Sequence, residues 1–538
     1  MAHICVGELR DWPRWYPLAC FRSGVVASAR VSSNVQADSP KGSLRAAAVS
    51  GGLWTGAQVV VNKGVSLLGT LVLMYLLVPE QFGIASIALS IQSLVMLLPA
   101  FTLSDVLLTR PEECVARLRV ATRLCAWITV AMSAMLVASG YLAAAHYEQP
   151  GLVTAGFVIA LRPVADLVLF GPQTLWRASL GFRRMAQMDA IGQTASTALS
   201  IVMAALGAGF VSILLPPILF TGVRAILYGR SPIQPAPPVP KDTRAPRPLF
   251  RDYLLSGLGQ YVHGGLVMIP PILIAQFSDE RHVGWFSTAF ALSASINTVV
   301  AVSVGLVLQP VFAQMTGDRS RQSAAFVRSC AAIAGVAMPA CLVQAALMGP
   351  AFRVALPERW SGAIPMGAVM SIGQAFYFAV NPAMGLLKAQ GRFHAFLVWQ
   401  SLQLGLVTAA MIVAAITWGA DPALSIVCVY GLYHLISSPV GVWLCVRDAE
   451  AAFRSIREIF AKPAIAATIV VLPSAWALSM APTGFVWDAL RIVAIPLATL
   501  VMYPWVLAKI APTTHTECMH LLAAVTRGRL GRAIESAK

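Results

Sequence analysis

The sequence predicts an all-α polytopic membrane protein of about fourteen transmembrane helices, arranged as two six-helix lobes followed by two C-terminal helices. Three observations support this prediction. Hydrophobic residues make up 57% of the 538 residues and charged residues only 12%, whereas soluble domains carry about 25% charged residues. Apolar segments of about 20 residues recur along the chain, and each can cross roughly 30 Å of hydrocarbon as a helix. The loops between them alternate between basic and acidic.

Residues 1–45 precede the first apolar segment. They carry tryptophan and arginine but no apolar run long enough for a cleavable signal peptide. We expect a flexible cytoplasmic arm here. Two alternatives are an interfacial anchor built on Trp12 and Trp15 and a translation start nearer Lys41 than Met1.

A proline-rich segment, residues 229–250, separates the first six spans from the rest and predicts a semi-rigid cytoplasmic linker. We therefore expect an N-terminal lobe over 46–228, a C-terminal lobe over 251–447, two further spans within 448–510 and a cytoplasmic tail over 511–538. The expected spans are 50–77, 83–107, 122–145, 151–176, 186–207, 210–228, 252–276, 284–308, 326–349, 362–387, 395–418, 422–445, 464–481 and 486–508.

Basic residues gather in alternate loops, which predicts that these loops and both termini face the cytoplasm. Arg117, Arg183 and Arg321 lie in the basic set, whereas Glu80 and Asp421 lie in the opposite, acidic set. The net charge of +16 is therefore better explained by orientation in the membrane than by nucleic-acid binding, and we expect no nucleic-acid partner.

The two lobes resemble each other in sequence, which predicts a pseudo-twofold axis along the membrane normal. Three short patterns recur in the same order at offsets of 201 to 210 residues. The matching pairs are Phe82-Gly83 with Val283-Gly284, Arg123 and Cys125 with Arg328 and Cys330, and Pro172 and Gly181 with Pro382 and Gly391.

The first span carries a polar stripe, in which Gln58, Asn62 and Lys63 share one side of the predicted helix. An ammonium group facing lipid is costly, so this stripe should face protein or water. In the seventh span, Gln260 and His263 share a similar arc. The repeat pairs Asn62 with His263, which predicts two polar stripes facing each other across a cavity. The alternative is a helix interface in which small and polar residues assist packing.

The predicted cavity is asymmetric in charge. Lys63 has no cationic counterpart in the second lobe, because the repeat aligns it with Gly264. We therefore expect more positive charge on the N-terminal lobe.

Arg162 and Asp166 lie one turn apart within the fourth span. They can form an internal ion pair, or Asp166 can hold the planar Arg162 guanidinium ready for a phosphate. Asp105 is a candidate gating residue at the cytoplasmic end of the second span. Asn297 and Asn381 are supporting candidates, as is Gln374, and each is equally suited to join neighbouring helices.

Motifs of the common hydrolases and nucleotide-binding enzymes are absent from the sequence: there is no P-loop, GxSxG or HExxH. The nine cysteines are scattered and form no CxxC pair. We therefore expect a transporter rather than an enzyme, with no cofactor and no metal.

The pattern GLW…LLVPEQFGIASIALSI…LSDVLLTR, the Pro172…Gly181-Phe182-Arg183 segment and the six-plus-six repeat resemble the polysaccharide transporter (Wzx-type) branch of the multidrug/oligosaccharidyl-lipid/polysaccharide superfamily. The resemblance covers about residues 45–510. It implies a flippase that moves an undecaprenyl-diphosphate-linked oligosaccharide across the bacterial inner membrane by alternating access. It also implies a cationic cavity, for which Lys63, Arg162 and His263 are the matching candidates, and partners such as a polymerase and a chain-length regulator.

Two other functions stay open. A cation-coupled exporter of drugs or metabolites from the same superfamily would need an acidic cavity residue, which the basic first and fourth spans disfavour. A membrane-embedded polymerase or ligase would normally carry a large periplasmic loop, and the sequence has none.

Overall fold

The computed structural model describes residues 61–96, 114–178, 182–230, 249–298, 319–390, 392–418, 420–447, 452–480, 482 and 484–519. Over these ranges the chain is helical, and no strand occurs in them. Each of the fourteen predicted spans coincides, at least in part, with a described helix, so the predicted fold class is confirmed.

The helices of the N-terminal half are Val61–Leu76, α4 (Pro79–Met96), α6 (Cys114–His146), α7 (Gly151–Ala178), α8 (Phe182–Ala205) and α9 (Val211–Arg230). Next come α10 (Leu249–Phe277), α11 (Glu280–Ser293), α12 (Ser295–Asn297), α14 (Arg319–Ala355), η4 (Glu358–Trp360), α15 (Ala363–Tyr377), α16 (Val380–Ala389), α17 (Phe393–Thr417), α18 (Pro422–Leu432) and α19 (His434–Val446). The last are α20 (Ala452–Ile456), η5 (Arg457–Ala461), α21 (Lys462–Ser479) and α22 (Phe485–Ile510).

The helices have the length and composition of membrane spans. Within the described residues, nine helices are long and apolar enough to cross a bilayer, and two shorter apolar helices accompany them. Large apolar side chains such as Trp127, Leu142, Val493 and Leu500 are exposed on α6 and α22, where lipid would cover them. The chain is a multi-pass membrane protein.

The chain forms two compact units. One contains residues up to Leu77 and Ile84–Gly257, and the other contains Val78–Gly83 and Leu258–Lys538. The predicted limits of the lobes and of the linker stay predictions, because residues 231–248 lie outside the described residues.

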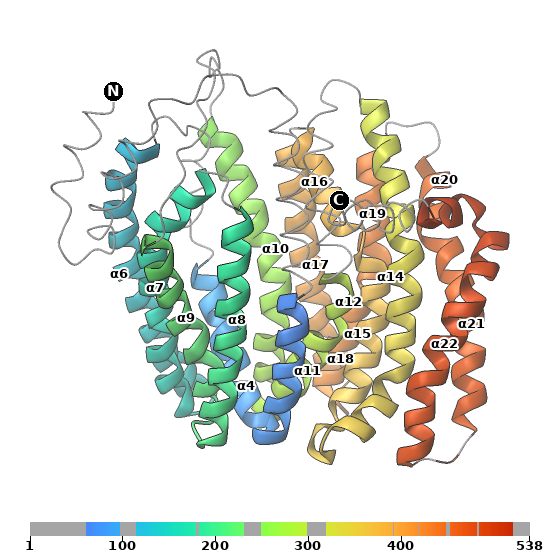
Figure 1. Cartoon of the computed structure of the whole chain (residues 1–538), viewed down its shortest axis with the longest axis horizontal. Coiled ribbons are helices and arrows are strands. Elements are labelled where there is room, and N and C mark those ends of the chain that lie inside the picture. The colour runs from blue at the N-terminus through green and yellow to red at the C-terminus, as the bar shows by residue number, and fades with distance from the viewer. Residues whose placement is uncertain are drawn as a thin grey trace, which may run out of the picture. The chain divides into compact units, whose positions relative to one another are not determined.

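In the N-terminal unit, α6 and α7 lie side by side and α7 also packs against α9 (Figure 1). The backbones of α6 and α7 touch at two glycines: a Cβ built on Gly140 would lie 2.8 Å from the Cα of Gly156, and the reverse distance is the same. Ser133 Oγ donates to the Ala160 carbonyl at 2.9 Å across the same pair of helices. Small residues thus permit the close approach that apolar helices need when water does not drive their association.

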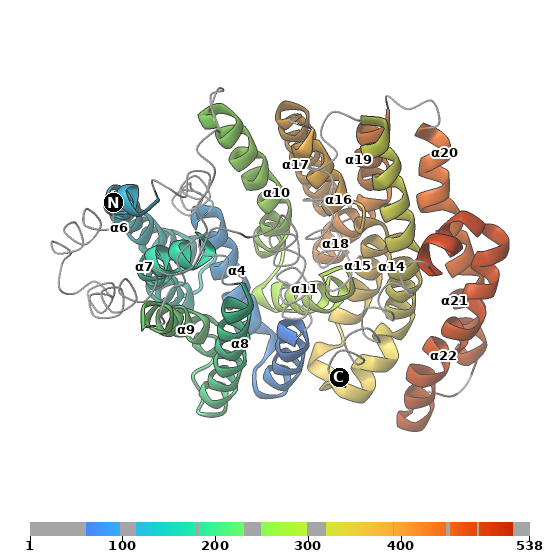
Figure 2. The same ribbon diagram turned by 45° about the horizontal axis from the view of Figure 1, so that its top comes forward.

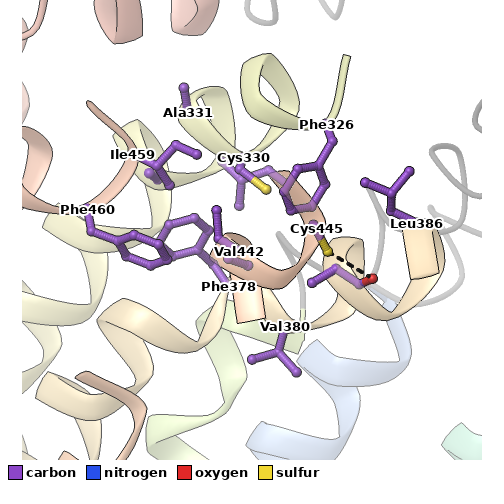
Figure 3. Close-up of a cluster of buried hydrophobic side chains, with 14 of the residues drawn as sticks. Phe326, Cys330, Ala331, Phe378, Val380, Leu386, Val442, Cys445, Ile459 and Phe460 are labelled. Carbon is purple, nitrogen blue, oxygen red and sulfur yellow. Dashed lines mark hydrogen bonds between the residues drawn. The ribbon is translucent and has the colours of Figure 1, made fainter. Parts of the chain in front are cut away.

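The core of the C-terminal unit is an apolar cluster shared by α14, α15, α16, α17, α19 and η5. Figure 3 shows Phe378 beside Phe460, with ring centroids 5.4 Å apart, and Cys445 with its thiol directed at a backbone carbonyl. That carbonyl belongs to Ala383, 3.6 Å away. The buried cysteines act here as small apolar side chains.

The last two long helices, α21 and α22, form an antiparallel hairpin that packs against α14 (Figure 2). One part of the contact between α22 and α14 is an ion cluster, beside apolar packing of Tyr503 and Leu507 against Val336 and Leu342. Asp488 on α22, 2% exposed, lies between Arg353 of α14 and Arg491. The Arg491 Nε also donates to the Leu478 carbonyl of α21 at 3.0 Å, so this cluster joins all three helices.

Residues Val78–Gly83 group with the C-terminal unit, although they precede the second span. A Cβ on Gly83 would lie 1.8 Å from the carbonyl oxygen of Glu280, and a Cβ on Gly284 would lie 1.9 Å from that of Pro79. The two contacts are related to each other by the repeat offset of 201 residues, which pairs Gly83 with Gly284 and Pro79 with Glu280. The sequence repeat is therefore matched by a reciprocal contact between the starts of α4 and α11.

Candidate functional site

The polar stripe of the first span is partly described. Asn62 and Lys63 are half-buried on the helix Val61–Leu76. The Asn62 Oδ1 atom is buried and accepts no hydrogen bond from any described residue. Gln58 lies outside the described residues. This helix packs on α8, because a Cβ on Gly69 would lie 2.2 Å from Thr197 Cγ2.

Arg162 and Asp166 form the ion pair that their spacing allows. Arg162 Nε lies 2.9 Å from Asp166 Oδ2 on α7. The arginine side chain is 28% exposed and the aspartate side chain 14% exposed. Within the described part of the chain, Nε is the only guanidinium nitrogen of Arg162 with a hydrogen bond. The pair therefore fixes the guanidinium plane and leaves its terminal nitrogens to another acceptor, as bidentate recognition of a phosphate requires.

A second arginine–aspartate pair stands on the neighbouring helices, and it was not predicted from the sequence. Arg224 on α9 donates to Asp189 on α8 at 2.9 Å and to Thr221 Oγ1 at 3.3 Å. Tyr228 donates to the same Asp189 oxygen at 3.1 Å. The sequence carries one signal for this pair. Both charged residues lie within predicted spans, where an unpaired charge is costly, so each needs a partner.

In the C-terminal unit, His263 lies half-buried on α10, and its Nε2 is 3.3 Å from the Tyr377 hydroxyl. The Tyr377 ring contacts a second histidine, His434, at a centroid distance of 4.7 Å. His434 was not a sequence candidate, although it lies within a predicted span. The Gln260 backbone belongs to α10, and its side chain lies outside what the structure describes.

Asn297, at the end of α12, donates through Nδ2 to the side-chain and backbone oxygens of Gln374 on α15; the side-chain distance is 2.9 Å. Asn297 and Gln374 thus join α12 to α15. Joining neighbouring helices was one of the two roles that the sequence suggested for them. Asn381 belongs to α16, but its side chain lies outside the described residues, and Asp105 lies outside them altogether.

The described site residues therefore fall into two chemical groups. The N-terminal unit holds cations within its spans, Lys63, Arg162 and Arg224, with an aspartate beside each arginine. The C-terminal unit holds neutral polar and aromatic side chains around His263. Among the described residues no group of three or more histidine, cysteine, aspartate or glutamate side chains could hold a metal ion. The predicted asymmetry of positive charge stays a prediction.

Comparison with known proteins identifies related chains. The sequence profile of a family described as "Polysaccharide biosynthesis protein" matches residues 72–365. The succinoglycan biosynthesis transport protein ExoT of Rhizobium meliloti (strain 1021) is 21% identical over 418 residues, which cover 74% of this chain and 80% of ExoT. The teichuronic acid biosynthesis protein TuaB of Bacillus subtilis (strain 168) is 24% identical over 256 residues, which cover 47% of this chain and 51% of TuaB.

A solved structure shares the fold. The lipid II flippase MurJ, in an inward closed conformation, superposes with a TM-score of 0.53 and 13% sequence identity. The match covers 86% of this chain and 99% of MurJ. At this identity the likeness shows the arrangement of the helices.

Proposed function

Since the chain belongs to the polysaccharide biosynthesis protein family, we propose that it moves an undecaprenyl-diphosphate-linked oligosaccharide from the cytoplasmic to the periplasmic leaflet of the bacterial inner membrane. The product would enter exopolysaccharide, capsule or O-antigen synthesis. The observation that carries this proposal is the Arg162–Asp166 pair, because it presents a fixed guanidinium inside a membrane span. The names of ExoT, a succinoglycan biosynthesis transport protein, and TuaB, a teichuronic acid biosynthesis protein, support the same substrate class.

The physical task is to carry a charged head group through hydrocarbon. The lipid tail stays in the bilayer while the diphosphate and sugars enter a cavity lined by the N-terminal stripe. Lys63 and Arg162 compensate the phosphate charge, and Asp166 positions Arg162. Asn62, Gln58, Gln260 and His263 contact sugar hydroxyls. Asp105, Asn297 and Asn381 support or gate this path.

The transport cycle would alternate access between the two faces of the membrane. The repeat supports two lobes that rock against each other, with the proline-rich linker permitting their motion. The alternation of basic and acidic loops supports cytoplasmic termini. The substrate would be handed to a polymerase and a chain-length regulator on the outer face.

The test is a knockout strain complemented with variants. Lys63→Ala and Arg162→Ala should insert normally and lower polymer export by about tenfold or more, because each removes a charge-assisted contact worth roughly 1.5–3 kcal/mol. Lipid-linked oligosaccharide should accumulate on the cytoplasmic leaflet. Arg454→Ala is the matched control, since this exposed arginine lies on α20 and has no part in the proposed site.

Two outcomes would contradict the proposal. Wild-type polymer yield in both cavity variants would remove Lys63 and Arg162 from the site. Loss of small-molecule resistance without any change in polymer or lipid-linked precursor in the knockout would favour the drug-exporter alternative instead.

A further inference from the structure

Two helices of the C-terminal unit are interrupted near the middle of the membrane span they form. The span Pro422–Val446 breaks at Tyr433, between α18 and α19, and the span Ala363–Leu387 breaks after Tyr377, between α15 and α16. Both Tyr433 and Phe378 keep helical dihedral angles, so the backbone does not unwind at these two interruptions, which we call the bends. Gly373 and Gly431 hold the two helices in backbone contact close by, since a Cβ on Gly373 would lie 1.8 Å from the Gly431 oxygen.

The side chains at these two interruptions meet. His434, the first residue of α19, lies among three tyrosines. Its ring centroid is 4.0 Å from that of Tyr433, 4.7 Å from that of Tyr377 and 6.0 Å from that of Tyr430. The hydroxyl of Tyr377 reaches His263 Nε2 at 3.3 Å. One tyrosine therefore connects the two histidines, and we name His263, Tyr377, Tyr430, Tyr433 and His434 the histidine–tyrosine cluster.

His434 is 3% exposed, and its Nδ1 atom is buried with no hydrogen-bond partner among the described residues. A buried polar atom of this kind needs a reason, because leaving it unpaired is unfavourable. A proton bound at Nδ1, or water that arrives with it, would satisfy the atom in another state of the protein.

Titratable or charged groups occur on the elements packed against α19, which are α15, α16, α18 and α20 together with α17, whose Trp399 lies against Gly441. On α15 the titratable group is Tyr377, and α18 contributes Cys428 and Tyr430. The charged residues are Lys388 on α16 and Arg454 on α20. Lys388 lies eight residues beyond the start of α16, about 12 Å along its axis.

On the α17 side, Arg392 donates to the Leu444 carbonyl of α19 at 3.1 Å, and His394 is exposed. The remaining groups are Cys445 on α19 itself and His263, which acts on His434 electrostatically from α10. Within the described residues, His434 forms no ion pair with any carboxylate, so it has no fixed counter-ion. Tyrosine rings can stabilise an imidazolium through their faces, which substitutes for a counter-ion in part. The cluster can therefore hold a proton. The free-energy cost of the buried imidazolium depends on whether water reaches the cluster.

We propose that the histidine–tyrosine cluster is a proton-binding site, in which His434 takes up one proton at Nδ1 when the bends at Tyr377 and Tyr433 open to water. Closing of the bends expels the water and releases the proton. A difference in proton affinity between two conformations couples proton binding to the conformational change, because each shifts the equilibrium of the other. Imidazole suits this role, since its ordinary titration range covers pH 5 to 8.

The Tyr377 hydroxyl links the site to His263, which belongs to the polar stripe predicted to contact substrate. Protonation of His434 would thus alter the hydrogen bond that orients His263. This coupling of protons to transport rests on the proposed flippase function, whereas proton binding by the cluster does not.

The test uses the full chain in lipid nanodiscs without sodium. Amide hydrogen exchange is measured at a series of pH values from about pH 5.5 to pH 8, with labelling times corrected for the intrinsic effect of pH. Exchange across residues 376–381 and 431–437 should be at least about threefold faster at the lower pH, because the imidazolium draws water into the bends. His434→Gln should abolish this difference. His394→Gln, at the exposed start of α17, should preserve it.

Tyr377→Phe provides a second variant should His434→Gln fail to fold. It keeps the ring and removes the hydroxyl bonded to His263, so it should shift the midpoint of the pH response without removing the response. An unchanged exchange rate over this pH range, or a pH response that persists in His434→Gln, would overturn the proposal. So would a response of these peptides to added sodium in place of protons. None of these readouts depends on polymer export, so a failure here is distinct from a failure of the flippase assignment.

Discussion

Asp488 accepts two parallel hydrogen bonds from Arg353, one from Nε and one from Nη2, each 2.8 Å long. The carboxylate side chain is 2% exposed, whereas the arginine side chain is 44% exposed. Arg491, 7% exposed, donates to the same carboxylate from within α22. The sequence repeat ends before α21 and α22, and this cluster explains how the additional hairpin is attached to α14.

Asp488→Asn should therefore destabilise the protein strongly, by about 3–5 kcal/mol, because it leaves the buried Arg491 without its counter-charge. Arg353→Gln should cost less, about 1 kcal/mol or below, because its side chain is partly in solvent. Thermal unfolding of the purified variants in nanodiscs measures both. Equal losses in the two variants would show that the exposed arginine, rather than the buried one, dominates the cluster.

Gly83→Val should disrupt the crossing of α4 and α11. The new side chain would meet the Glu280 carbonyl, which is backbone and cannot rotate away, so the helices must separate at a cost of about 1–3 kcal/mol. Gly284→Val should produce a similar loss. Unfolding temperature and polymer export are the two readouts. Gly222→Ala serves as the control, since nothing lies within 4 Å of its Cβ position; a Gly83 variant as stable as this control would contradict the crossing.

Substitutions at Arg224 and Arg162 should have different effects: a change at Arg224 should lower stability, and a change at Arg162 should lower transport. Arg224 joins α9 to α8 through Asp189 and also donates to Thr221. Arg224→Lys loses the second donor and should lower the unfolding temperature. Arg162 bonds within one helix, and such a pair contributes only about 0.3–0.5 kcal/mol. Arg162→Lys should thus unfold like the native protein but export less polymer. The opposite pattern would assign the phosphate contact to Arg224.

Asp279 makes the start of α11 sensitive to acid. It caps the helix by accepting from the His282 amide at 3.0 Å. Partial burial raises the pKa of this carboxyl, but hydrogen bonds from the His282 amide and ring and the charges of His282 and Arg281 lower it further, so the net pKa lies below its usual value. The cap is thus fully present above the unfolded pKa of about 3.9 and is lost as pH falls through the lower folded value.

Amide exchange of residues 280–284 measures this cap. Exchange, corrected for intrinsic rates, should increase only below about pH 4. Asp279→Ala should show the increase at neutral pH, with a loss of about 1 kcal/mol. Asp279→Asn should keep the cap at all pH values, since the amide oxygen also accepts. Acid-dependent exchange in the asparagine variant would assign the effect to another group.

The sequence predicted the spans well because hydrocarbon thickness sets their length. The predicted span 151–176 and the helix α7, Gly151–Ala178, differ by two residues at one end. The interruptions inside spans were harder to predict. Pro382 explains the bend at Phe378, since proline removes the bond to the carbonyl four residues earlier. Nothing in the local sequence marks the bend at Tyr433, and packing against α15 accompanies it.

The candidate site was predicted in part. The spacing of Arg162 and Asp166 specified their pairing, because i,i+4 neighbours share one helix face. The partners of Arg224 and His263 come from other helices, at separations of 35 and 114 residues. No local pattern encodes such contacts. The predicted apposition of Asn62 and His263 stays a prediction.

The reciprocal glycine contact has the symmetry of an interface between two identical subunits. In a twofold-symmetric homodimer, residue i of one subunit meets residue j of the other, and j meets i. Gly83 with Glu280 and Gly284 with Pro79 obey this rule inside a single polypeptide. The crossing therefore has the symmetry of a subunit interface within one chain, and a single kind of glycine contact, used twice, lets α4 and α11 approach.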